Sequence, residues 1–192
     1  MSEALDLKEK RICIFGLQGS GKTEWLRFLC RNAERPFVYD PLDQFNDIPH
    51  AITYVPKHKT YCPEALAELN KVIRWALSQK EPPTLLAIDE CNRWCPNKKA
   101  LPEIISYLND EQRHLHLALA FIARRPVQLN TDLAELAHYL ILFSLAGKND
   151  RQYLNDLADG LGDRVVKLPW HDFLVVDPQR NYEQYPALQL HG

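Results

Sequence analysis

The sequence predicts an α/β fold built on a mostly parallel β-sheet flanked by helices. Short apolar segments of strand length alternate along the chain with segments in which apolar residues recur at helical spacing. The apolar run within residues 84–89 is continuous, which is typical of a strand buried on both faces of a parallel sheet. Residues 41–50, rich in Pro, Asp and Asn, separate two such segments as a loop. Strands that alternate with helices in this way form βαβ units, which build a parallel sheet.

The elements can be assigned in chain order. The first strand covers residues 11–16, a helix follows at residues 22–33, and a longer helix at residues 63–80 opens with a proline, which suits a first helical turn. Further strands are expected at residues 36–40, 51–56, 84–89, 117–123 and 139–145. Further helices are expected around residues 101–108, 131–137 and 151–161. Two edge strands, residues 163–169 and 172–178, are expected to close the chain as a C-terminal β-hairpin.

Length and charge exclude several classes of protein. At 192 residues the chain fits one domain, so we expect residues 1–192 to form a single unit. The formal net charge is −2, so no overall positive field attracts nucleic acid, and any such contact must come from a local patch. The longest apolar stretches are far shorter than the ~20 residues of a membrane span, and the acidic start does not resemble a signal peptide. We therefore expect a soluble protein of the cytoplasm.

Five cysteines at irregular spacing indicate reduced thiols rather than a disulfide framework. Cys91 and Cys95 could be combined with His114 and His116 into a zinc site. That spacing is loose for zinc, and Pro96 follows the second cysteine at once, so buried or unreactive thiols are the favoured interpretation.

Residues 16–23, with the sequence GLQGSGKT, match the phosphate-binding pattern GxxxxGK followed by Ser or Thr, between a predicted strand and a predicted helix. The glycines allow successive backbone N–H groups to point at an anion, and the helix N-terminus adds partial positive charge. Lys22 is expected to reach the β- and γ-phosphates, and the Thr23 hydroxyl to ligate Mg²⁺. The alternative, a glycine-rich turn without a ligand, leaves the Lys-Thr pair unexplained. The expected cofactors are therefore ATP and Mg²⁺, bound by Gly16, Gln18, Gly19, Ser20, Gly21, Lys22 and Thr23.

Two adjacent carboxylates, Asp89 and Glu90, end the apolar segment LLAIDE. Asp89 is expected to hold Mg²⁺ through water, and Glu90 to polarise an attacking water. Burying such a pair for structural reasons alone is costly, so a purely structural role is the weaker interpretation. The Asp-Glu pair favours hydrolysis of ATP over phosphoryl transfer to a small acceptor.

Four segments resemble the FtsK-HerA superfamily of DNA-pumping ATPases, in the order and at about the spacing of that family. They are residues 16–23, 38–45, 85–90 and 111–126, so the four segments extend over residues 16–126. The second segment contains Asp40-Pro41, which matches an Asp-Pro pair that follows the second strand in the family. The resemblance implies a RecA-like P-loop NTPase fold of the ASCE division.

The resemblance also assigns roles to two arginines. Arg113 falls at the family's arginine-finger position, from which the side chain completes the active site of a neighbouring subunit. Arg124 lies on the strand whose polar residue senses the γ-phosphate, and it stands where many members carry Gln. Arg124 either contacts the γ-phosphate, since guanidinium matches phosphate bidentately, or forms a structural ion pair at the strand end. The expected catalytic residues are Lys22, Glu90, Arg113 and Arg124.

The short length of the chain favours a resemblance to the smallest members of the family. Larger members carry membrane segments, a DNA-reading winged helix or a β-barrel cap, and none of these is evident in the sequence. The bare motor domain resembles the genome-packaging ATPases of internal-membrane viruses with double-jelly-roll capsids. This resemblance implies ATP-driven packaging of double-stranded DNA, a homo-oligomeric ring, expected to be a hexamer, and docking to capsid-vertex or membrane-associated proteins. A viral protein of this kind would lie in the host cytoplasm or the virion. A cellular or plasmid HerA-like translocase and a filamentous-phage morphogenesis ATPase remain open.

Two short basic loops are candidates for DNA contact. Lys57 and Lys59 follow the third strand, and Lys98 and Lys99 follow the strand that ends at Asp89. In ring translocases such loops face the central pore, where lysines meet phosphates without reading sequence. Solvated surface charge is the alternative for each loop.

Two other classes of function remain open on the sequence. A small nucleoside or nucleotide kinase also carries a phosphate loop at about this length, although Glu90 beside Asp89 and the lack of an Arg-rich lid argue against it. A non-translocating switch that binds ATP to dock on a capsid or membrane partner would show turnover that does not respond to DNA.

Overall fold

The computed structural model describes residues 7–188, so residues 1–6 and 189–192 of the expected 1–192 domain lie outside the described part. Its strands are β1 (Arg11–Phe15), β2 (Pro36–Tyr39), β3 (Ile52–Tyr54), β4 (Leu85–Ile88), β5 (Ala118–Ala123), β6 (Tyr139–Phe143), β7 (Phe173–Val176) and β8 (Tyr182–Tyr185). Its α-helices are α1 (Lys22–Asn32), α2 (Pro63–Leu77), α3 (Glu103–Glu111), α4 (Thr131–Glu135), α5 (Lys148–Leu157) and α6 (Leu161–Val166). Two short 3-10 helices are η1 (Cys91–Arg93) and η2 (Pro126–Gln128).

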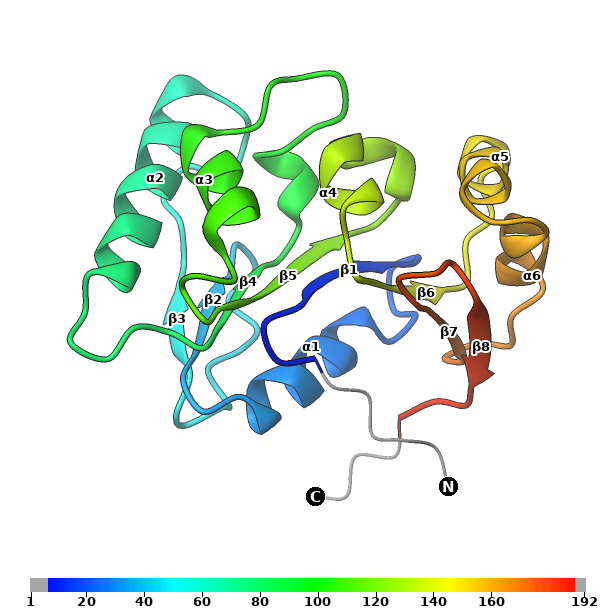
Figure 1. Ribbon diagram of the computed structural model, residues 1–192, viewed down its shortest axis with the longest axis horizontal. Coiled ribbons are helices and arrows are strands. Elements are labelled where there is room, and N and C mark those ends of the chain that lie inside the picture. Colours follow the sequence, from blue (N-terminus) through cyan, green and yellow to red (C-terminus); the bar gives the residue numbers. More distant parts are fainter. Residues whose placement is uncertain (1–6, 189–192) are drawn as a thin grey trace.

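These strands form one sheet in the order β3-β2-β4-β5-β1-β6-β7-β8 (Figure 1). The strands from β3 to β6 run parallel, whereas β7 and β8 are antiparallel to their neighbours. β5 lies between β1 and β4, with Phe15 in register with Ala123 and Ile88 in register with Phe121. The carboxyl ends of β1, β5 and β4 therefore meet at one edge of the sheet. The predicted α/β fold with a mostly parallel sheet is confirmed.

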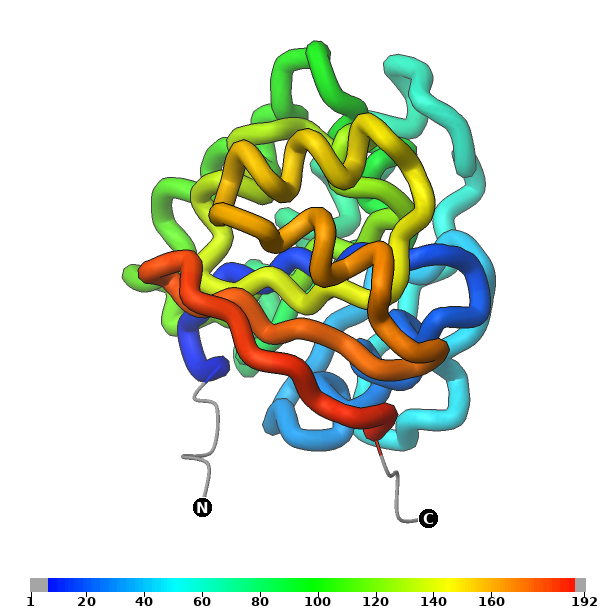
Figure 2. The backbone as a smooth tube through the Cα atoms, turned by 90° about the vertical axis from the view of Figure 1, so that its right-hand side faces the viewer, coloured from blue at the N-terminus to red at the C-terminus, as the bar shows by residue number. Residues whose placement is uncertain are grey.

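Helices cover both faces of the sheet: α1 lies on one face, and α2, α3 and α4 lie on the other (Figure 1). Successive strand residues point to opposite layers. In β1, Phe15 belongs to the core cluster that contains Leu69 of α2. Its neighbour Ile14 belongs to the cluster that contains Leu26 of α1. Figure 2 shows α5 and α6 beside each other over the β6 end of the sheet. Within residues 7–188 no helix has the length and apolarity needed to cross a membrane.

The C-terminal β-hairpin is present, but one of its strands differs from the prediction. Residues 172–178 contain β7, as expected, whereas residues 163–169 do not form a strand because α6 occupies most of them. Leu161 and Val165, four residues apart, are both fully buried, so the apolar residues here follow a helical period rather than alternate along a strand. The partner of β7 is instead β8, reached through a tight turn in which Asn181 donates from its backbone to the Asp177 carboxylate.

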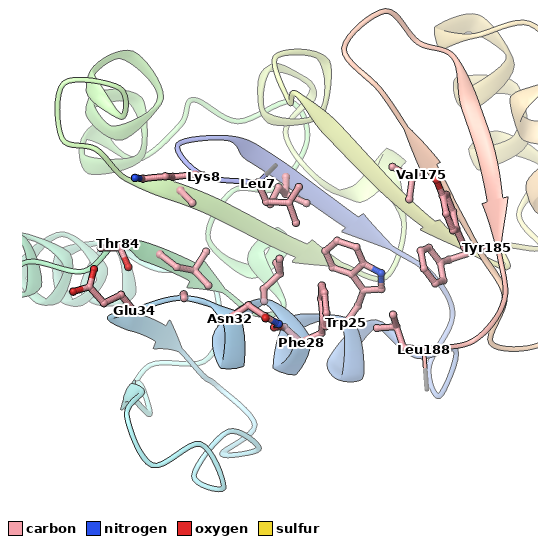
Figure 3. A pocket seen from close by; sticks show the side chains of 16 residues that line it. Leu7, Lys8, Trp25, Phe28, Asn32, Glu34, Thr84, Val175, Tyr185 and Leu188 are labelled. Atoms are coloured by element: carbon pink, nitrogen blue, oxygen red, sulfur yellow. The ribbon is translucent and has the colours of Figure 1, made fainter. Parts of the chain in front are cut away.

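A mostly apolar cavity of about 690 Å³ lies between α1 and the sheet (Figure 3). Trp25 and Phe28 of α1 line it together with Tyr185 of β8, and Leu7 and Leu188 contribute from the two ends of the described chain. None of the residues predicted to bind nucleotide lines this cavity. Cavity size alone therefore does not identify the functional site.

Candidate nucleotide-binding and hydrolysis site

Three loops converge at the carboxyl edge of the sheet. The glycine-rich loop follows β1, Asp89 and Glu90 follow β4, and Arg124 follows β5. Because β5 pairs with both β1 and β4, these three loops are neighbours in space although they are far apart in the sequence. The topology thus brings together the predicted phosphate-binding loop, the acidic pair and one of the two predicted arginines.

The glycine-rich loop requires glycine at two positions for steric reasons. A Cβ on Gly16 would lie 2.5 Å from Cβ of Phe143, which belongs to β6. Gly21 immediately precedes α1 with a φ of 118°, and a Cβ there would lie 2.8 Å from the Phe143 ring. The Ser20 hydroxyl within this loop is buried and has no hydrogen-bond partner in the described part of the chain. Phosphate oxygens accept hydrogen bonds, so a phosphate group would satisfy this donor.

Lys22 folds back over the loop that precedes it. Its Nζ donates to the carbonyl oxygens of Gly16 at 2.7 Å and Leu17 at 2.8 Å. Burial lowers the pKa of Lys22, and the nearby charges of Glu90 and Asp89 act in the opposite direction. A buried ammonium group at the mouth of a loop of this kind is arranged to meet an anion.

Asp89 is buried at the end of β4, and burial raises its pKa to about 6. The nearby charges of Glu90 and Asp40 raise this pKa as well, whereas Lys22 lowers it. In the described residues no group of three or more His, Cys, Asp or Glu side chains could cage a metal ion. The oxygen donors of Asp89 and Thr23 nevertheless fit Mg²⁺, since this ion is usually held by one or two protein ligands together with phosphates and water.

Glu90 is the residue at which the chain turns sharply after β4. Its φ of 48° and ψ of 39° lie in the left-handed region, which is uncommon for a side chain of this size. Its Oε1 accepts a hydrogen bond of 3.0 Å from Nε of Arg124, and Nε of Arg93 lies 3.8 Å from its Oε2. Of the two interpretations of Arg124, the structure contains the ion pair at the strand end. Contact between Arg124 and a γ-phosphate stays a prediction.

Asp40 organises the loop after β2. Its carboxylate is fully buried and accepts from the backbone N–H groups of Leu42 at 3.2 Å, Gln44 at 2.6 Å and Phe45 at 3.1 Å. Such a carboxylate fixes the local turn and places a negative charge near Asp89. The Asp-Pro pair therefore has a clear structural purpose next to the site.

Arg113 is not brought to this site. It lies in the turn between α3 and β5, at the amino edge of the sheet, where its Nη2 is 3.4 Å from Nε2 of His138. The length of β5 separates this edge from the glycine-rich loop by roughly 16 Å. Burial lowers the pKa of His138 to about 4, and the charges of Arg11, Lys10 and Arg113 add to this effect, so His138 is neutral. Its Nδ1 accepts from the backbone N–H of Arg11 at 3.1 Å, which leaves the proton on Nε2, so the approach of Arg113 to Nε2 is a contact rather than a hydrogen bond. Within its own chain, Arg113 cannot act on a phosphate held by the loop.

Both predicted basic loops rise from the side of the molecule that lies uppermost in Figures 1 and 2. Lys57 and Lys59 lie between β3 and α2, Lys98 and Lys99 lie between η1 and α3, and these four side chains are exposed. Hydrogen bonds hold the backbone of both loops. Glu68 accepts from N–H of Lys57 at 2.8 Å, and Asn130 donates to the carbonyl of Lys99 at 2.7 Å.

The zinc alternative is wrong. Cys91 and Cys95 are buried in the core after β4, and burial raises the pKa of Cys91. His114 and His116 are exposed in the turn before β5, at the opposite edge of the sheet, where His116 is 2.8 Å from a carboxylate oxygen of Glu9. The cysteines thus serve packing, as the favoured interpretation of the sequence has it.

Two residues at the site were missed by the sequence analysis. Arg93 lies three residues after Glu90, a spacing at which helical neighbours meet, so the contact could have been found once the turn after β4 was assigned as helical. Trp170 lies beside Gly19 of the glycine-rich loop, although the two are 151 positions apart in the sequence. No local sequence signal points to that second contact.

A phosphate loop between a strand and a helix, with an Asp-Glu pair on a strand one place removed in the same sheet, defines a P-loop NTPase. The chain belongs to the ATPase family associated with various cellular activities (AAA), whose model matches residues 12–145. The matched region runs from β1 to the end of β6 and includes Lys22, Asp89, Glu90 and Arg124. No curated protein sequence matches the chain.

Solved structures with the same fold include ATPases from two viruses. The genome packaging NTPase B204 from Sulfolobus turreted icosahedral virus 2, in complex with ATP-gammaS, has a TM-score of 0.76 and 15% identity, over 94% of this chain and 98% of that chain. B204, the DNA-packaging ATPase from Sulfolobus Turreted Icosahedral Virus, has a TM-score of 0.78 and 13% identity, over 95% and 100%. The N-terminal domain of zonular occludens toxin from Neisseria meningitidis has a TM-score of 0.58 and 15% identity, over 94% and 95%. The predicted P-loop ATPase fold, similar to that of minimal genome-packaging ATPases, is confirmed.

Proposed function

We propose that this protein hydrolyses ATP with Mg²⁺ and uses the energy to move double-stranded DNA into a viral capsid. The observation that carries the proposal is the meeting of the glycine-rich loop, the Asp89-Glu90 pair and Arg124 at one edge of the sheet. Support for DNA as the cargo comes from B204, a DNA-packaging ATPase whose fold matches nearly the whole of both chains. A cellular or plasmid HerA-like translocase, or a phage morphogenesis ATPase, would use the same chemistry.

The site residues divide the work of hydrolysis. The glycine-rich loop holds the phosphates, and Lys22 exchanges its contacts with the carbonyls of Gly16 and Leu17 for phosphate oxygens. Thr23 and Asp89 are the residues that would hold Mg²⁺, which when bound neutralises charge on the β- and γ-phosphates. Glu90 orients the attacking water and takes its proton.

The ion pair with Arg124 limits where the Glu90 carboxylate can point. Oε1 of Glu90 accepts from Arg124, so Oε2, which Nε of Arg93 approaches to 3.8 Å, is the oxygen left to accept a proton from water. Arg124 is nearly half exposed and can turn toward a γ-phosphate without leaving the strand end. Arg124 thereby couples the position of the Glu90 carboxylate, the general base, to the presence of nucleotide.

Movement of DNA needs several motor domains around one axis, so we propose a homo-oligomeric ring, a hexamer, of the domain formed by residues 1–192. Lys57, Lys59, Lys98 and Lys99 would face the central pore and contact phosphates without reading sequence. Arg113 would complete the site of the neighbouring subunit, since it cannot reach its own. Capsid-vertex or membrane-associated proteins would be the docking partners of such a ring.

The proposal is tested by the rate of ATP hydrolysis with and without double-stranded DNA. We expect DNA duplexes of unrelated sequence to raise the rate equally, and the effect to fade with salt, because contacts to the phosphate backbone release counterions. A rate of ATP hydrolysis that does not change when DNA is added would contradict the proposal of a translocase. It would favour a protein that binds ATP in order to dock on a partner. Transfer of phosphate to an added nucleoside or nucleotide would instead favour a kinase.

A further inference from the structure

An exposed indole lies beside the phosphate loop. Trp170, in the segment between α6 and β7, has 53% of its surface exposed. Its Cζ2 is 3.8 Å from the position that a Cβ on Gly19 would take, which is van der Waals distance from the loop. About half of the Trp170 side chain is therefore accessible to a ligand next to the loop that is proposed to bind the phosphates.

The sheet order sets the direction in which a bound nucleotide must run. In the proposed function, Glu90 and Arg124 approach the γ-phosphate from the side of β4 and β5, where the two residues are paired with each other. β6 borders β1 on the other side, and β7 follows, with Phe173 in register with Phe143. Because Phe143 packs beneath the loop and Trp170 precedes Phe173 by three residues, Trp170 stands on the side away from the γ-phosphate. That is the side on which the base must lie.

The segment that carries Trp170 is held in place before any ligand binds. The backbone N–H of Asp172 donates to the carbonyl of Pro169 at 3.2 Å, and His171 takes a φ of 72° to complete this turn. The His171 ring packs edge-on against the indole, with the ring centroids 5.7 Å apart. The Asp172 carboxylate accepts from Gln184 of β8 at 2.8 Å, which ties the turn to the C-terminal hairpin. A side chain positioned in this way loses little freedom on binding.

We propose that Trp170 is the platform on which the purine base of the nucleotide stacks, an inference that rests on the nucleotide-binding part of the proposed function. Stacking uses the faces of the rings and reads no hydrogen-bonding edge, so it favours large bases over small ones without separating adenine from guanine. The platform therefore gives the site a preference for purine over pyrimidine triphosphates.

Binding of ATP and of inorganic tripolyphosphate, both with Mg²⁺, separates stacking from phosphate binding. We expect Trp170→Ala to weaken ATP binding on the order of tenfold in titration calorimetry, and Trp170→Phe to retain most of the affinity because it keeps an aromatic face. Tripolyphosphate, which has no base, should bind the wild type and both variants equally. Trp75→Ala is the matched control, since Trp75 is 50% exposed on α2, away from the loop.

Three outcomes would overturn the inference. One is a Trp170→Ala protein that binds ATP as the wild type does, and another is equal loss of ATP and tripolyphosphate, which would mean that the loop itself is damaged. The third is a wild-type protein that binds ATP no more tightly than tripolyphosphate, because the purine base would then add nothing to the affinity. A wild type that binds neither ligand would instead overturn the proposed function, and the platform with it. A fluorescence titration adds a second readout: ATP should quench the wild type and Trp75→Phe, and this quenching should be lost in Trp170→Phe.

Discussion

Glu90 holds a backbone conformation that costs about 1–2 kcal/mol for a residue with a Cβ. Glycine would relieve that cost but would remove the carboxylate, and a more extended backbone would carry the side chain away from Arg124. The strain is thus located at the residue that we propose as the general base. Lys22 contacts the glycine-rich loop, whereas Glu90 contacts Arg124. Substitutions at the two positions should therefore have different effects on binding and on hydrolysis of ATP.

Replacement of these two residues separates binding of ATP from its hydrolysis. Glu90→Gln keeps the shape of the side chain and loses the base, so we expect ATP to bind within about threefold of the wild type while turnover falls by about 10²–10⁴. Lys22→Ala removes a phosphate contact and should weaken ATP binding tenfold or more, on the order of the loss of a charge-assisted hydrogen bond. Calorimetry and steady-state rates measure the two effects, with the exposed Lys71→Ala as control. A Glu90→Gln protein that turns over at the wild-type rate would show that another group is the base.

At the scale of elements, the two basic loops rise from the same side of the molecule (Figure 2). Lys57, Lys59, Lys98 and Lys99 are exposed on these loops. The Asn130 side chain anchors the backbone of the second loop at Lys99, and Glu68 anchors the first at Lys57. Anchored backbone and exposed ammonium groups suit contact with a regular array of phosphates. They give no means of reading base edges.

Neutralising the second loop tests this arrangement. We expect Lys98→Ala combined with Lys99→Ala to weaken DNA binding and to lower the slope of log K against log salt by roughly one unit per lysine. Lys71→Ala combined with Lys80→Ala, which removes the same charge from α2 and the segment that follows it, should leave the slope unchanged. DNA binding measured across a salt series decides the point. An unchanged slope in the Lys98-Lys99 variant would remove that loop from the DNA path.

The elements also show which parts of the structure the sequence could predict. The phosphate loop, the strand before the acidic pair and the order of strands and helices up to β6 follow from local patterns, because each motif lies within one strand-loop-helix unit. The sequence predicts an edge strand at residues 163–169, and only packing against α5 reveals α6 there. The Arg124-Glu90 pair and the approach of Trp170 to Gly19 depend on the sheet order, which no local pattern encodes.

At the scale of the whole molecule, the two candidate sets of active-site groups lie at opposite edges of one sheet. Glu90 and the glycine-rich loop lie at the carboxyl edge, and Arg113 lies at the amino edge. One chain cannot bring them together, whereas a ring of chains can place the amino edge of one subunit against the nucleotide of the next. An arginine supplied in this way typically raises the rate by 10³–10⁵, roughly 4–7 kcal/mol of transition-state stabilisation.

Mixing two inactive variants tests the ring. We expect Arg113→Ala to lose turnover while keeping ATP affinity, and Arg74→Ala, an exposed arginine of α2, to keep both. Combining Arg113→Ala subunits with Glu90→Gln subunits should restore part of the activity, because some interfaces then pair an intact base with an intact arginine. Mixed rings that form, as judged by native mass measurement, but recover no turnover would show that Arg113 acts in cis or serves only the structure.

The central claim is that ATP hydrolysis at this site moves the protein along double-stranded DNA, and displacement of a third strand from a DNA triplex measures that movement directly. The account predicts that the wild type releases the third strand with ATP and Mg²⁺, that a non-hydrolysable ATP analogue gives no release, and that Glu90→Gln gives none although it binds ATP. Release without ATP, or none by a wild type that hydrolyses ATP on the same DNA, would contradict the claim.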